Sequence, residues 1–380
     1  MTTQGTIMLK LKNNQFLPSG RYFEMKKIIV AMSGGVDSSV AAYLLKKNGY
    51  EVVGLSFELW DQRDIGKSSV CCSVETIQIA KEVAKKLNIE HYTVDVRDDF
   101  YRYVIENFCT SYAIGLTPNP CILCNKFIKF KFLLEKAKEL GADLIATGHY
   151  ARIEKSQKPA ATRYSLLKGV DQRKDQSYVL YTMTQEELSK TFFPLGDFKK
   201  DMIRAIAGEL GITDAIRSES QEICFVGNGN YIDFIKNAAP DTLQPGPIVN
   251  MHNKIIGEHK GIAFYTVGQR KRLGLSTLSP TYVVEINRHH NTIKVGSRED
   301  AFKKSFTVKE INWISIEFLS EPLRANLKIR STMREEPAII IPDINQRVIV
   351  EFEKPQWAPA PGQSAVFYHD DFVIGGGIIE

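Results

Sequence analysis

Two groups of residues in this sequence have the types and spacing that chemistry requires. The first is the segment AMSGGVDSS at positions 31–39, in which serine and two glycines precede an aspartate. The second is the pair Cys121 and Cys124, joined far along the chain by Cys224. A glycine-rich turn before a helix presents backbone N–H groups and the positive end of the helix dipole, so the first group suits a phosphate. Thiolates are soft nucleophiles and metal ligands, so the second group suits sulfur or metal chemistry.

The glycine-rich segment differs from the common mononucleotide loop, which has lysine and then serine or threonine after its last glycine. Val36 and Asp37 stand there instead, which argues against a γ-phosphate cradle of that type. An aspartate inside the loop suits a site in which Asp37 is a ligand of Mg²⁺ that neutralises phosphates. The alternative is that Asp37 caps the helix. Ser38 and Ser39 are expected to cap the helix and to donate hydroxyl hydrogen bonds.

The Cys-x-x-Cys pair by itself allows half of a zinc site, a redox pair or two iron–sulfur ligands. The sequence has no second such pair and no Cys/His pair with finger spacing, which argues against a closed structural zinc site. A cysteine at the start of a lysine-rich helix has enhanced reactivity, which favours catalysis. Cys224, which Phe and Val follow, is either a reactive thiol or a buried inert one. Cys71 and Cys72 are expected to have a structural or lineage-specific role, and Cys109, within an apolar helix pattern, is expected to lie in the core.

The surrounding sequence predicts the scaffold that positions these groups. Apolar runs predict strands at residues 27–32, 51–57, 91–96 and 143–147, and amphipathic helices at 74–88 and 126–140 lie among them. Alternating strands and helices predict an α/β domain with a doubly wound, mostly parallel sheet covered on both faces. Ligands bind beyond the carboxyl ends of such strands, where the glycine-rich loop and the segment ATGHY at 146–150 are expected to lie.

The pattern changes after about residue 222. A segment rich in glycine and proline predicts a small central domain at 223–279, and regularly spaced strand patterns predict a C-terminal all-β barrel at 280–380. The α/β domain is expected to span residues 25–222. Residues 1–24 have little periodic pattern and are treated as a tail of unknown role.

Composition limits the class of protein. The 380 residues are 43% hydrophobic and 24% charged, with a formal net charge of +5, which permits nucleic-acid binding without requiring it. No apolar stretch approaches the ~20 residues that span a bilayer, and no secretory signal is apparent, so a cytoplasmic protein is expected. Two cationic segments are candidate contacts for phosphates: the helix bearing Lys126, Lys129 and Lys131, and GQRKRLG at 268–274.

The motifs together resemble a known family. SGGVDSS resembles the signature of the pyrophosphate-loop ATP pyrophosphatases, which cleave ATP between its α- and β-phosphates. The segments AMSGGVDSS, TPNPCILCNKFIKF, ATGHYARI, KDQSYVLY, ESQEICF, YTVGQRKRLG and PGQSAVFY resemble, in the same order, those of the tRNA-specific 2-thiouridylases. The resemblance covers roughly residues 25–380 and implies ATP-dependent 2-thiolation of the wobble uridine of tRNA.

The resemblance also implies roles for individual residues. Cys124 matches the catalytic nucleophile and Cys224 the cysteine that carries a persulfide, and the two form a transient disulfide during turnover. Positions implied to contact ATP are Ala31, Met32, Ser33, Gly34, Gly35, Val36, Asp37, Ser38, Phe57 and Gly148. Positions implied to contact the target base are Asn119, Pro120 and Cys121. Positions implied to contact tRNA are His149, Lys174, Asp175, Gln176, Arg330, Ser331 and Gln363.

The implied cofactors and partners are ATP, Mg²⁺, tRNA and a cysteine desulfurase or sulfur-relay protein.

The chain departs from the family pattern at three positions: Phe57 replaces a frequent Met, Ser331 a frequent Tyr, and Cys121 an Asp. Because of the last change, Cys121, Cys124 and Cys224 are three candidate ligands for a [4Fe-4S] cluster, an alternative to the persulfide. Two other functions remain open: an ATP pyrophosphatase that forms an amide, and an RNA- or nucleotide-binding module without catalysis.

Overall fold

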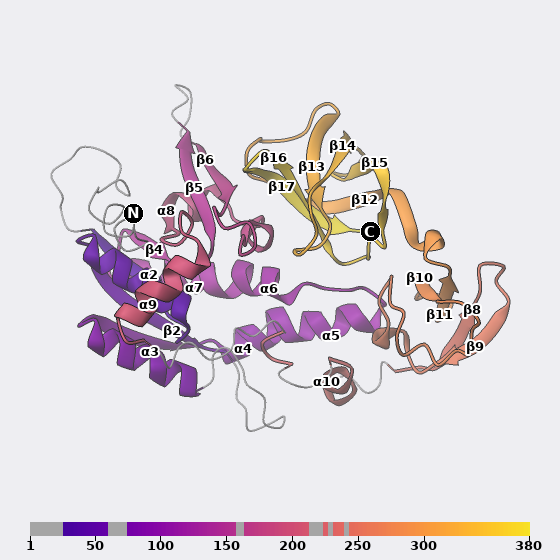
Figure 1. Cartoon of the computed structure of the whole chain (residues 1–380), viewed down its shortest axis with the longest axis horizontal. Helices are drawn as coiled ribbons and strands as arrows, with labels where there is room; N and C mark the ends of the chain where they lie inside the picture. Colours follow the sequence, from indigo (N-terminus) through magenta and orange to yellow (C-terminus); the bar gives the residue numbers. More distant parts are fainter. Residues whose placement is uncertain (1–25, 60–73, 157–162, 213–222, 227–230, 239–242) are drawn as a thin grey trace.

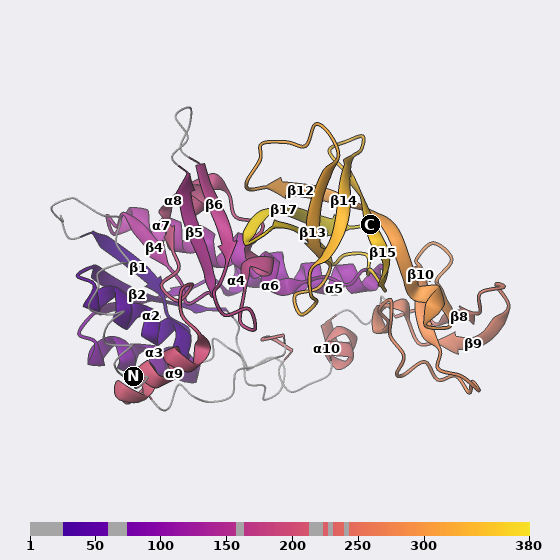
Figure 2. The ribbon, with the colours of Figure 1, turned by 45° about the horizontal axis from the view of Figure 1, so that its top comes forward.

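The computed structural model describes residues 26–59, 74–156, 163–212, 223–226, 231–238 and 243–380. Residues 1–24 and the pair Cys71 and Cys72 lie outside these ranges. Figures 1 and 2 show an elongated molecule with a parallel sheet at one end and a small sheet at the other. A barrel lies beside the helical segment that connects them. In the described ranges, no helix is long and apolar enough to cross a membrane.

A five-stranded sheet forms the core of the N-terminal part, and its strand order is β3-β2-β1-β4-β7. All of its pairings are parallel. The strands are β1 (Lys27–Ala31), β2 (Glu51–Glu58), β3 (Glu90–Asp95), β4 (Leu144–Ala146) and β7 (Thr191–Phe192). The chain places β2 and β3 on one side of β1, and then β4 and β7 on the other side. The strand order therefore reverses between β1 and β4. The predicted doubly wound α/β fold is confirmed.

Alternation along β1 divides the sheet into two buried faces. Ile28 and Val30 pack with the helices of one face, and Ile29 packs with those of the other. The first face is covered by α2 (Val36–Lys47), α3 (Val74–Lys86) and α9 (Lys200–Glu209). The second is covered by α7 (Phe130–Glu139) and by the start of a helical segment, α4 (Arg97–Phe100) and α5 (Glu106–Ala113), which runs from this face toward the central part (Figure 1). Residues of the first strand are therefore buried on both sides, as a central parallel strand requires.

Two turns of π-helix interrupt the helices of the second face. One is η1 (Tyr101–Ile105), between α4 and α5. The other is η2 (Cys124–Lys129), between the short α6 (Pro120–Leu123) and α7. The prediction of one helix over 126–140 is thus met by a π turn followed by an α-helix. Such turns are rare, are frequent at functional sites, and here include Cys124.

A hairpin of the N-terminal part leaves the parallel sheet and joins the barrel. It consists of β5 (Ala151–Ser156) and β6 (Arg163–Lys168), and Leu167 pairs with Phe372 of β17. An eight-stranded sheet results, in the order β12-β15-β14-β13-β16-β17-β6-β5. The hairpin is followed by η3 (Ser177–Leu180) and α8 (Gln185–Lys190). Backbone hydrogen bonding therefore attaches the barrel to the α/β part (Figure 1).

The C-terminal strands form the predicted antiparallel barrel, which an additional pairing of β12 with β17 closes. Its interior contains Val308, Leu327, Ile340, Val350 and Phe367, all at most 1% exposed. The strands are β12 (Phe302–Trp313), β13 (Leu323–Lys328), β14 (Glu336–Pro342), β15 (Val348–Trp357), β16 (Ser364–His369) and β17 (Phe372–Ile379). The η7 turn (Glu299–Ala301) precedes β12.

The central part has a four-stranded sheet in the order β10-β11-β8-β9. Its elements are α10 (Tyr231–Ala238), β8 (Gly246–Val249), β9 (Ile255–His259), η6 (Ile262–Phe264), β10 (Tyr282–Asn287) and β11 (Thr292–Gly296). The sequence placed residues 282–296 in the barrel domain, yet Ile293 of β11 pairs with Ile248 of β8. We therefore propose that the boundary between the central part and the barrel lies near residue 300.

Candidate functional site

The positions implied to contact ATP lie together at the carboxyl edge of the parallel sheet. Ala31 ends β1 and Met32 follows it, while Phe57 is near the end of the adjacent β2. On the other side of β1, Gly148 follows β4. These three strands are neighbours and parallel, so their ends meet at one edge. This is the edge at which α/β sheets bind ligands.

The glycine-rich loop has a shape that requires glycine at position 34. Gly34 has φ of +75°, and a Cβ there would lie 2.2 Å from the carbonyl oxygen of Thr76 in α3. Gly35 is the N-cap of α2, and no side chain caps this helix. The expectation that Ser38 and Ser39 cap the helix is wrong, because both hydroxyls donate to the Gly35 carbonyl (3.1 and 2.9 Å). The N–H groups of the first turn consequently remain directed at the loop, as in an anion site.

Asp37 forms a close polar cluster with two residues from distant parts of the chain. The Lys200 ammonium donates to both oxygens of the Asp37 carboxylate, at 2.7 and 2.8 Å. The Tyr150 hydroxyl donates to one of the same oxygens at 2.7 Å. The Lys200 side chain is only 5% exposed. Asp37 is therefore a paired carboxylate and not a helix cap, and a cation stands beside a loop that has no lysine of its own.

The sequence did not identify Lys200 as part of this site. It begins α9, directly after Lys199, and no local pattern distinguishes the two lysines. In the structure they differ, because Lys199 is exposed and Lys200 is buried. The Lys200 backbone N–H also donates to the buried Asp171 carboxylate at 3.0 Å, which fixes the start of the helix. Only the fold shows that Lys200 faces the loop.

Gly148 contacts the start of α2 so closely that no side chain fits. A Cβ at this position would lie 2.9 Å from the Ser38 nitrogen and 3.0 Å from the Asp37 carbonyl carbon. We expect Gly148→Ala to displace the loop and to weaken binding of a non-hydrolysable ATP analogue by about tenfold. Calorimetric titration measures this. The matched control is Gly208→Ala in α9, where a Cβ meets nothing within 4 Å.

The control should keep wild-type affinity and raise the free energy of unfolding by roughly 0.5–1 kcal/mol, since alanine favours a helix over glycine. Equal affinity of the Gly148→Ala variant and the wild type for the analogue would show that the contact does not shape a nucleotide site.

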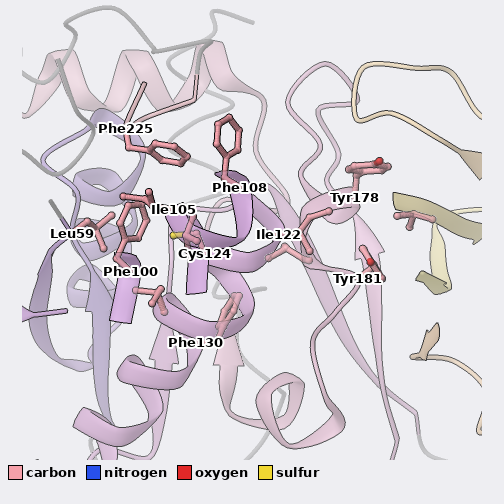
Figure 3. Packing of buried hydrophobic residues seen from close by; sticks show 14 of the residues in the cluster. Leu59, Phe100, Ile105, Phe108, Ile122, Cys124, Phe130, Tyr178, Tyr181 and Phe225 are labelled. Carbon is pink, nitrogen blue, oxygen red and sulfur yellow. The ribbon is translucent and has the colours of Figure 1, made fainter. Parts of the chain in front are cut away.

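Cys124 is placed by a helix whose start is encoded locally. Asn119 is the N-cap of α6, its side chain accepts from the Cys121 N–H at 3.2 Å, and Pro120 occupies the first helical position. Both residue types are typical of these positions. Cys124 is buried among apolar side chains, and Figure 3 shows its sulfur near Phe100 and Ile105. The thiol is thus held away from bulk water.

Cys224 belongs to the same region although it is far away in the sequence. It packs, half-buried, against the hydrophobic cluster that contains Cys124. The adjacent Phe225 anchors it, with ring centroids 5.9 Å from Phe100 and 5.1 Å from Phe108 (Figure 3). The structure therefore brings the two cysteines singled out from the sequence into one cluster.

The other cysteines differ in their environment. Cys121 is exposed at the start of α6. Cys109 is buried in α5, which confirms its predicted core position, and burial raises the pKa of its thiol to about 11. Across the described ranges, no three His, Cys, Asp or Glu side chains are grouped to hold a metal ion. The arrangement therefore does not support an iron–sulfur cluster on Cys121, Cys124 and Cys224.

His149 is a buried ring at the carboxyl edge of the sheet. Its Nδ1 lies 2.7 Å from the Thr147 hydroxyl, and its ring packs against both Phe130 and Phe193, which also contact each other. Burial, and secondly the charge of Lys129, lowers its pKa well below 6.5. A ring so placed is neutral at pH 7. Its contact with tRNA stays a prediction.

The lowered pKa of His149 has a consequence for stability. Below pH 6.5 the imidazole binds a proton in the unfolded protein but stays neutral in the folded protein. Proton binding therefore favours the unfolded state, and the free energy of unfolding decreases as the pH falls below 6.5. We expect urea unfolding at about pH 7.5 and 5.5 to show a smaller loss in His149→Gln than in the wild type. Exposed His252→Gln is the control. The same loss in all three proteins would contradict the assignment.

Most positions implied to contact tRNA already have partners within the protein. The Asp175 carboxylate accepts from the N–H groups of Gly169 and Ser177 at 3.1 Å and pairs with Lys328 of β13 at 3.4 Å. Arg330 donates to the Ala358 carbonyl at 2.6 Å, and burial lowers the pKa of its guanidinium. These contacts join the α/β part to the barrel or brace the barrel itself.

The remaining implied positions are more accessible. Gln176 and Ser331 are exposed, with the Gln176 side-chain oxygen accepting from the Tyr150 N–H at 3.0 Å, and Lys174 is half-buried. The candidate phosphate contacts Arg270, Lys271 and Arg272 are all exposed, as are Lys126 and Lys131, whereas Lys129 is half-buried. Their contacts with RNA stay predictions.

A parallel α/β sheet with a glycine-rich loop at its carboxyl edge, followed by a small sheet and a barrel, defines a nucleotide-binding protein of the HUP class. A family model described as "tRNA methyl transferase HUP domain" matches residues 26–228. Models described as "tRNA methyl transferase PRC-barrel domain" and "Aminomethyltransferase beta-barrel domain" match residues 232–297 and 303–379.

Similar proteins have a common name. The chain is 48% identical over 357 residues to a tRNA-specific 2-thiouridylase MnmA of Clostridium perfringens, covering 93% of this chain and 98% of the relative. It is 50% identical over 357 residues to MnmA 2 of Thermoanaerobacter sp. (93% and 98%). It is 45% identical over 359 residues to MnmA of Clostridioides difficile (94% and 99%). The chain belongs to the tRNA-specific 2-thiouridylase family.

Proposed function

We propose that this protein catalyses ATP-dependent 2-thiolation of the wobble uridine of tRNA. The observation that carries the proposal is the combination of a glycine-rich anion loop at the sheet edge with Cys124 and Cys224, which pack in one hydrophobic cluster. ATP pyrophosphatases of the amide-forming kind have no need of two such cysteines. The names of the full-length relatives agree with this reaction.

The first step activates the base. The oxygen at C2 of uracil is a poor leaving group, and its attack on the α-phosphate of ATP gives an adenylated base and pyrophosphate. We place the phosphates on the N–H groups of residues 34–38 and the adenosine against the edge near Phe57 and Gly148. Preorganised donors of this kind stabilise the charge that develops on the departing pyrophosphate.

The second step transfers sulfur. The terminal sulfur of a persulfide on Cys224 forms a bond to C2 of the base, and AMP leaves with the original oxygen. Attack of the Cys124 thiolate on the inner sulfur of Cys224 breaks the S–S bond and leaves the transferred atom on the base. The product of this attack is a disulfide between the two cysteines. A thiol reductant must reduce it before the next turnover.

Asp37 fits the role of a magnesium ligand. Magnesium usually binds nucleotides through one or two carboxylates, with phosphate oxygens and water completing its shell. Asp37 offers one carboxylate at the loop and is already paired with a cation. When bound, Mg²⁺ neutralises charge on the leaving pyrophosphate. Lys200 and Tyr150 orient the carboxylate, and Lys200 keeps a positive charge beside the phosphates.

Two macromolecular partners follow from this chemistry. The RNA substrate would meet the exposed cations of residues 270–272 and Gln176 and Ser331. The target base must leave its stack to reach Asn119, Pro120 and Cys121, which precede the nucleophile. The sulfur atom on Cys224 requires a donor, for which we propose a cysteine desulfurase or a sulfur-relay protein.

The decisive experiment is mass spectrometry of tRNA nucleosides after incubation of the protein with ATP, Mg²⁺, tRNA and a sulfur donor. We expect 2-thiouridine together with pyrophosphate release that depends on tRNA. An active donor without 2-thiouridine would sink the proposal. No pyrophosphate at all would favour an RNA-binding module, whereas amide formation from ammonia would indicate an amide-forming synthetase.

A further inference from the structure

The loop before the nucleophile helix is a junction of three parts of the chain. Residues 115–118 directly precede the N-cap Asn119 of α6. Thr117 is only 9% exposed. The barrel contacts the loop from one side and the central part from the other. The position of the catalytic helix therefore depends on residues far outside the α/β part.

Contacts from the barrel come from one turn between β15 and β16. The Thr117 N–H donates to the Pro361 carbonyl at 2.8 Å. The Gln363 side-chain amide donates back to the carbonyls of Thr117 at 3.0 Å and Pro118 at 3.4 Å. Gly362, with φ of +91°, lies so close that a Cβ there would be 2.9 Å from the Thr117 nitrogen. The turn at residues 361–363 and the loop at residues 115–118 are thus in close contact, and part of this contact is made by backbone atoms.

The barrel turn is itself fixed. The Gly362 N–H donates to the Ile379 carbonyl at 2.9 Å, and the Gln363 carbonyl accepts from the Ile379 N–H at 2.8 Å. These two bonds tie the turn to the last strand, β17. A side chain on such a turn has a defined position before any ligand binds. The hydrogen bonds of the Gln363 amide therefore hold the loop in a fixed place relative to the barrel.

The central part contacts the other side of the loop. The Thr117 hydroxyl donates to the Thr266 hydroxyl at 3.3 Å. Gly115, with φ of +78°, would place a Cβ 2.6 Å from the Ile286 side chain of β10. Since the barrel, the central part and the α/β part meet at Thr117, movement of any of them relative to the others must shift this loop or break its bonds.

We propose that Gln363 is a positioning residue for sulfur transfer, which holds the start of α6 through its bonds to Thr117 and Pro118. The inference rests on the proposed function and adds to it. The barrel would then do more than bind RNA, because it would also set the place of Asn119, Cys121 and Cys124. If Gln363 only contacts RNA, its substitution should raise the Kd for tRNA. If Gln363 positions the loop, its substitution should lower the rate of sulfur transfer at saturating tRNA.

The test uses the full-length protein with Gln363→Glu, which keeps the shape but turns a donor into a carboxylate facing two carbonyl oxygens. Gln363→Met, which has no donor and no charge, is the second variant. The matched control is Gln346→Glu, an equal charge change at an exposed barrel position. Thermal unfolding monitored by circular dichroism identifies any variant that does not fold.

Two readouts separate the roles. At saturating tRNA, we expect single-turnover formation of 2-thiouridine to fall by about tenfold to a hundredfold in both Gln363 variants, with the Kd for tRNA within about twofold of wild type. In the absence of RNA, the rate at which iodoacetamide alkylates exposed Cys121 should change in both variants and not in the control. Wild-type turnover at saturating tRNA with a raised Kd would overturn the proposal and assign Gln363 to RNA binding alone.

Failure of the proposed function would look different. In that case the wild type would form no 2-thiouridine with an active donor, yet the alkylation assay needs neither RNA nor ATP and would still report on the loop. An unchanged alkylation rate in both folded variants would refute positioning whatever the reaction is.

Discussion

Replacing Cys124 with serine is expected to leave tRNA without 2-thiouridine while the protein keeps its fold and still releases pyrophosphate in a first turnover. Serine has nearly the same shape, but its hydroxyl cannot attack a persulfide at neutral pH. The activating step uses the glycine-rich loop and should survive. Mass spectrometry of nucleosides and a pyrophosphate assay on the same samples measure the two steps separately.

Cys224→Ser should also abolish thiolation, for a different reason. A variant without this thiol cannot carry the sulfur, so intact-protein mass spectrometry after incubation with the donor should show no added sulfur atom on residue 224. Cys124→Ser should still be loaded. The control is Cys109→Ala, which removes a buried thiol from α5 and should leave both loading and thiolation intact. Thiolation by either Cys124→Ser or Cys224→Ser would refute the role given to that residue.

A substitution of Cys121 distinguishes sulfur transfer from a persulfide from a mechanism that uses an iron–sulfur cluster. Cys121→Asp introduces the residue type that the family resemblance implies at this position and removes a candidate iron ligand. We expect this variant to thiolate tRNA at a rate close to wild type. Loss of activity together with loss of iron from anaerobically purified protein would favour the cluster instead.

Lys200→Met is expected to lower tRNA-dependent pyrophosphate release by about a hundredfold or more, since it removes the cation beside the glycine-rich loop. The change leaves the Asp37 carboxylate with the Tyr150 hydroxyl and without its ammonium partner. The Asp37 carboxylate is one-third exposed and keeps its hydrogen bond from Tyr150, so loss of the ammonium should cost about 1–3 kcal/mol and the variant should unfold at lower urea concentration. Lys200→Arg should recover part of the activity.

The adjacent lysine provides the control. Lys199→Met removes the same charge one residue earlier, at an exposed position, and should keep wild-type stability and rate. A double-mutant cycle with Asp37→Asn tests the pair, because the two changes should be far from additive if they remove one interaction. Wild-type pyrophosphate release by folded Lys200→Met would show that its charge is not used.

Some features could be predicted because their causes are local. The runs Lys27–Ala31 and Glu51–Glu58 are apolar and short, and buried parallel strands need such sequences. The amphipathic pattern of residues 126–140 likewise predicts a helix there, since apolar side chains recur at helical spacing. The order of motifs around the cysteines was enough to indicate the family, because reactive residue types are visible in a sequence wherever they finally lie.

Other features depend on segments that meet only in the folded chain. Strands β10 and β11 read as barrel strands, since their alternation is the same in either sheet, and only the pairing with β8 assigned them to the central part. The hairpin of β5 and β6 likewise had no sequence pattern that indicated its pairing with the barrel. Backbone hydrogen bonds between strands do not depend on residue type, so the choice of partner follows from packing.

The sequence by itself determined which residues have reactive groups and that a glycine-rich loop precedes α2. It showed a loop that lacked a lysine. The tertiary structure supplied that lysine, because Lys200, 163 residues from Asp37 along the chain, is buried against its carboxylate. It also brought Cys224 and Cys124 into one hydrophobic cluster and Gln363 to the loop at Thr117. An ion pair or a hydrogen bond depends on distance in space, and only the packing of the whole chain sets that distance.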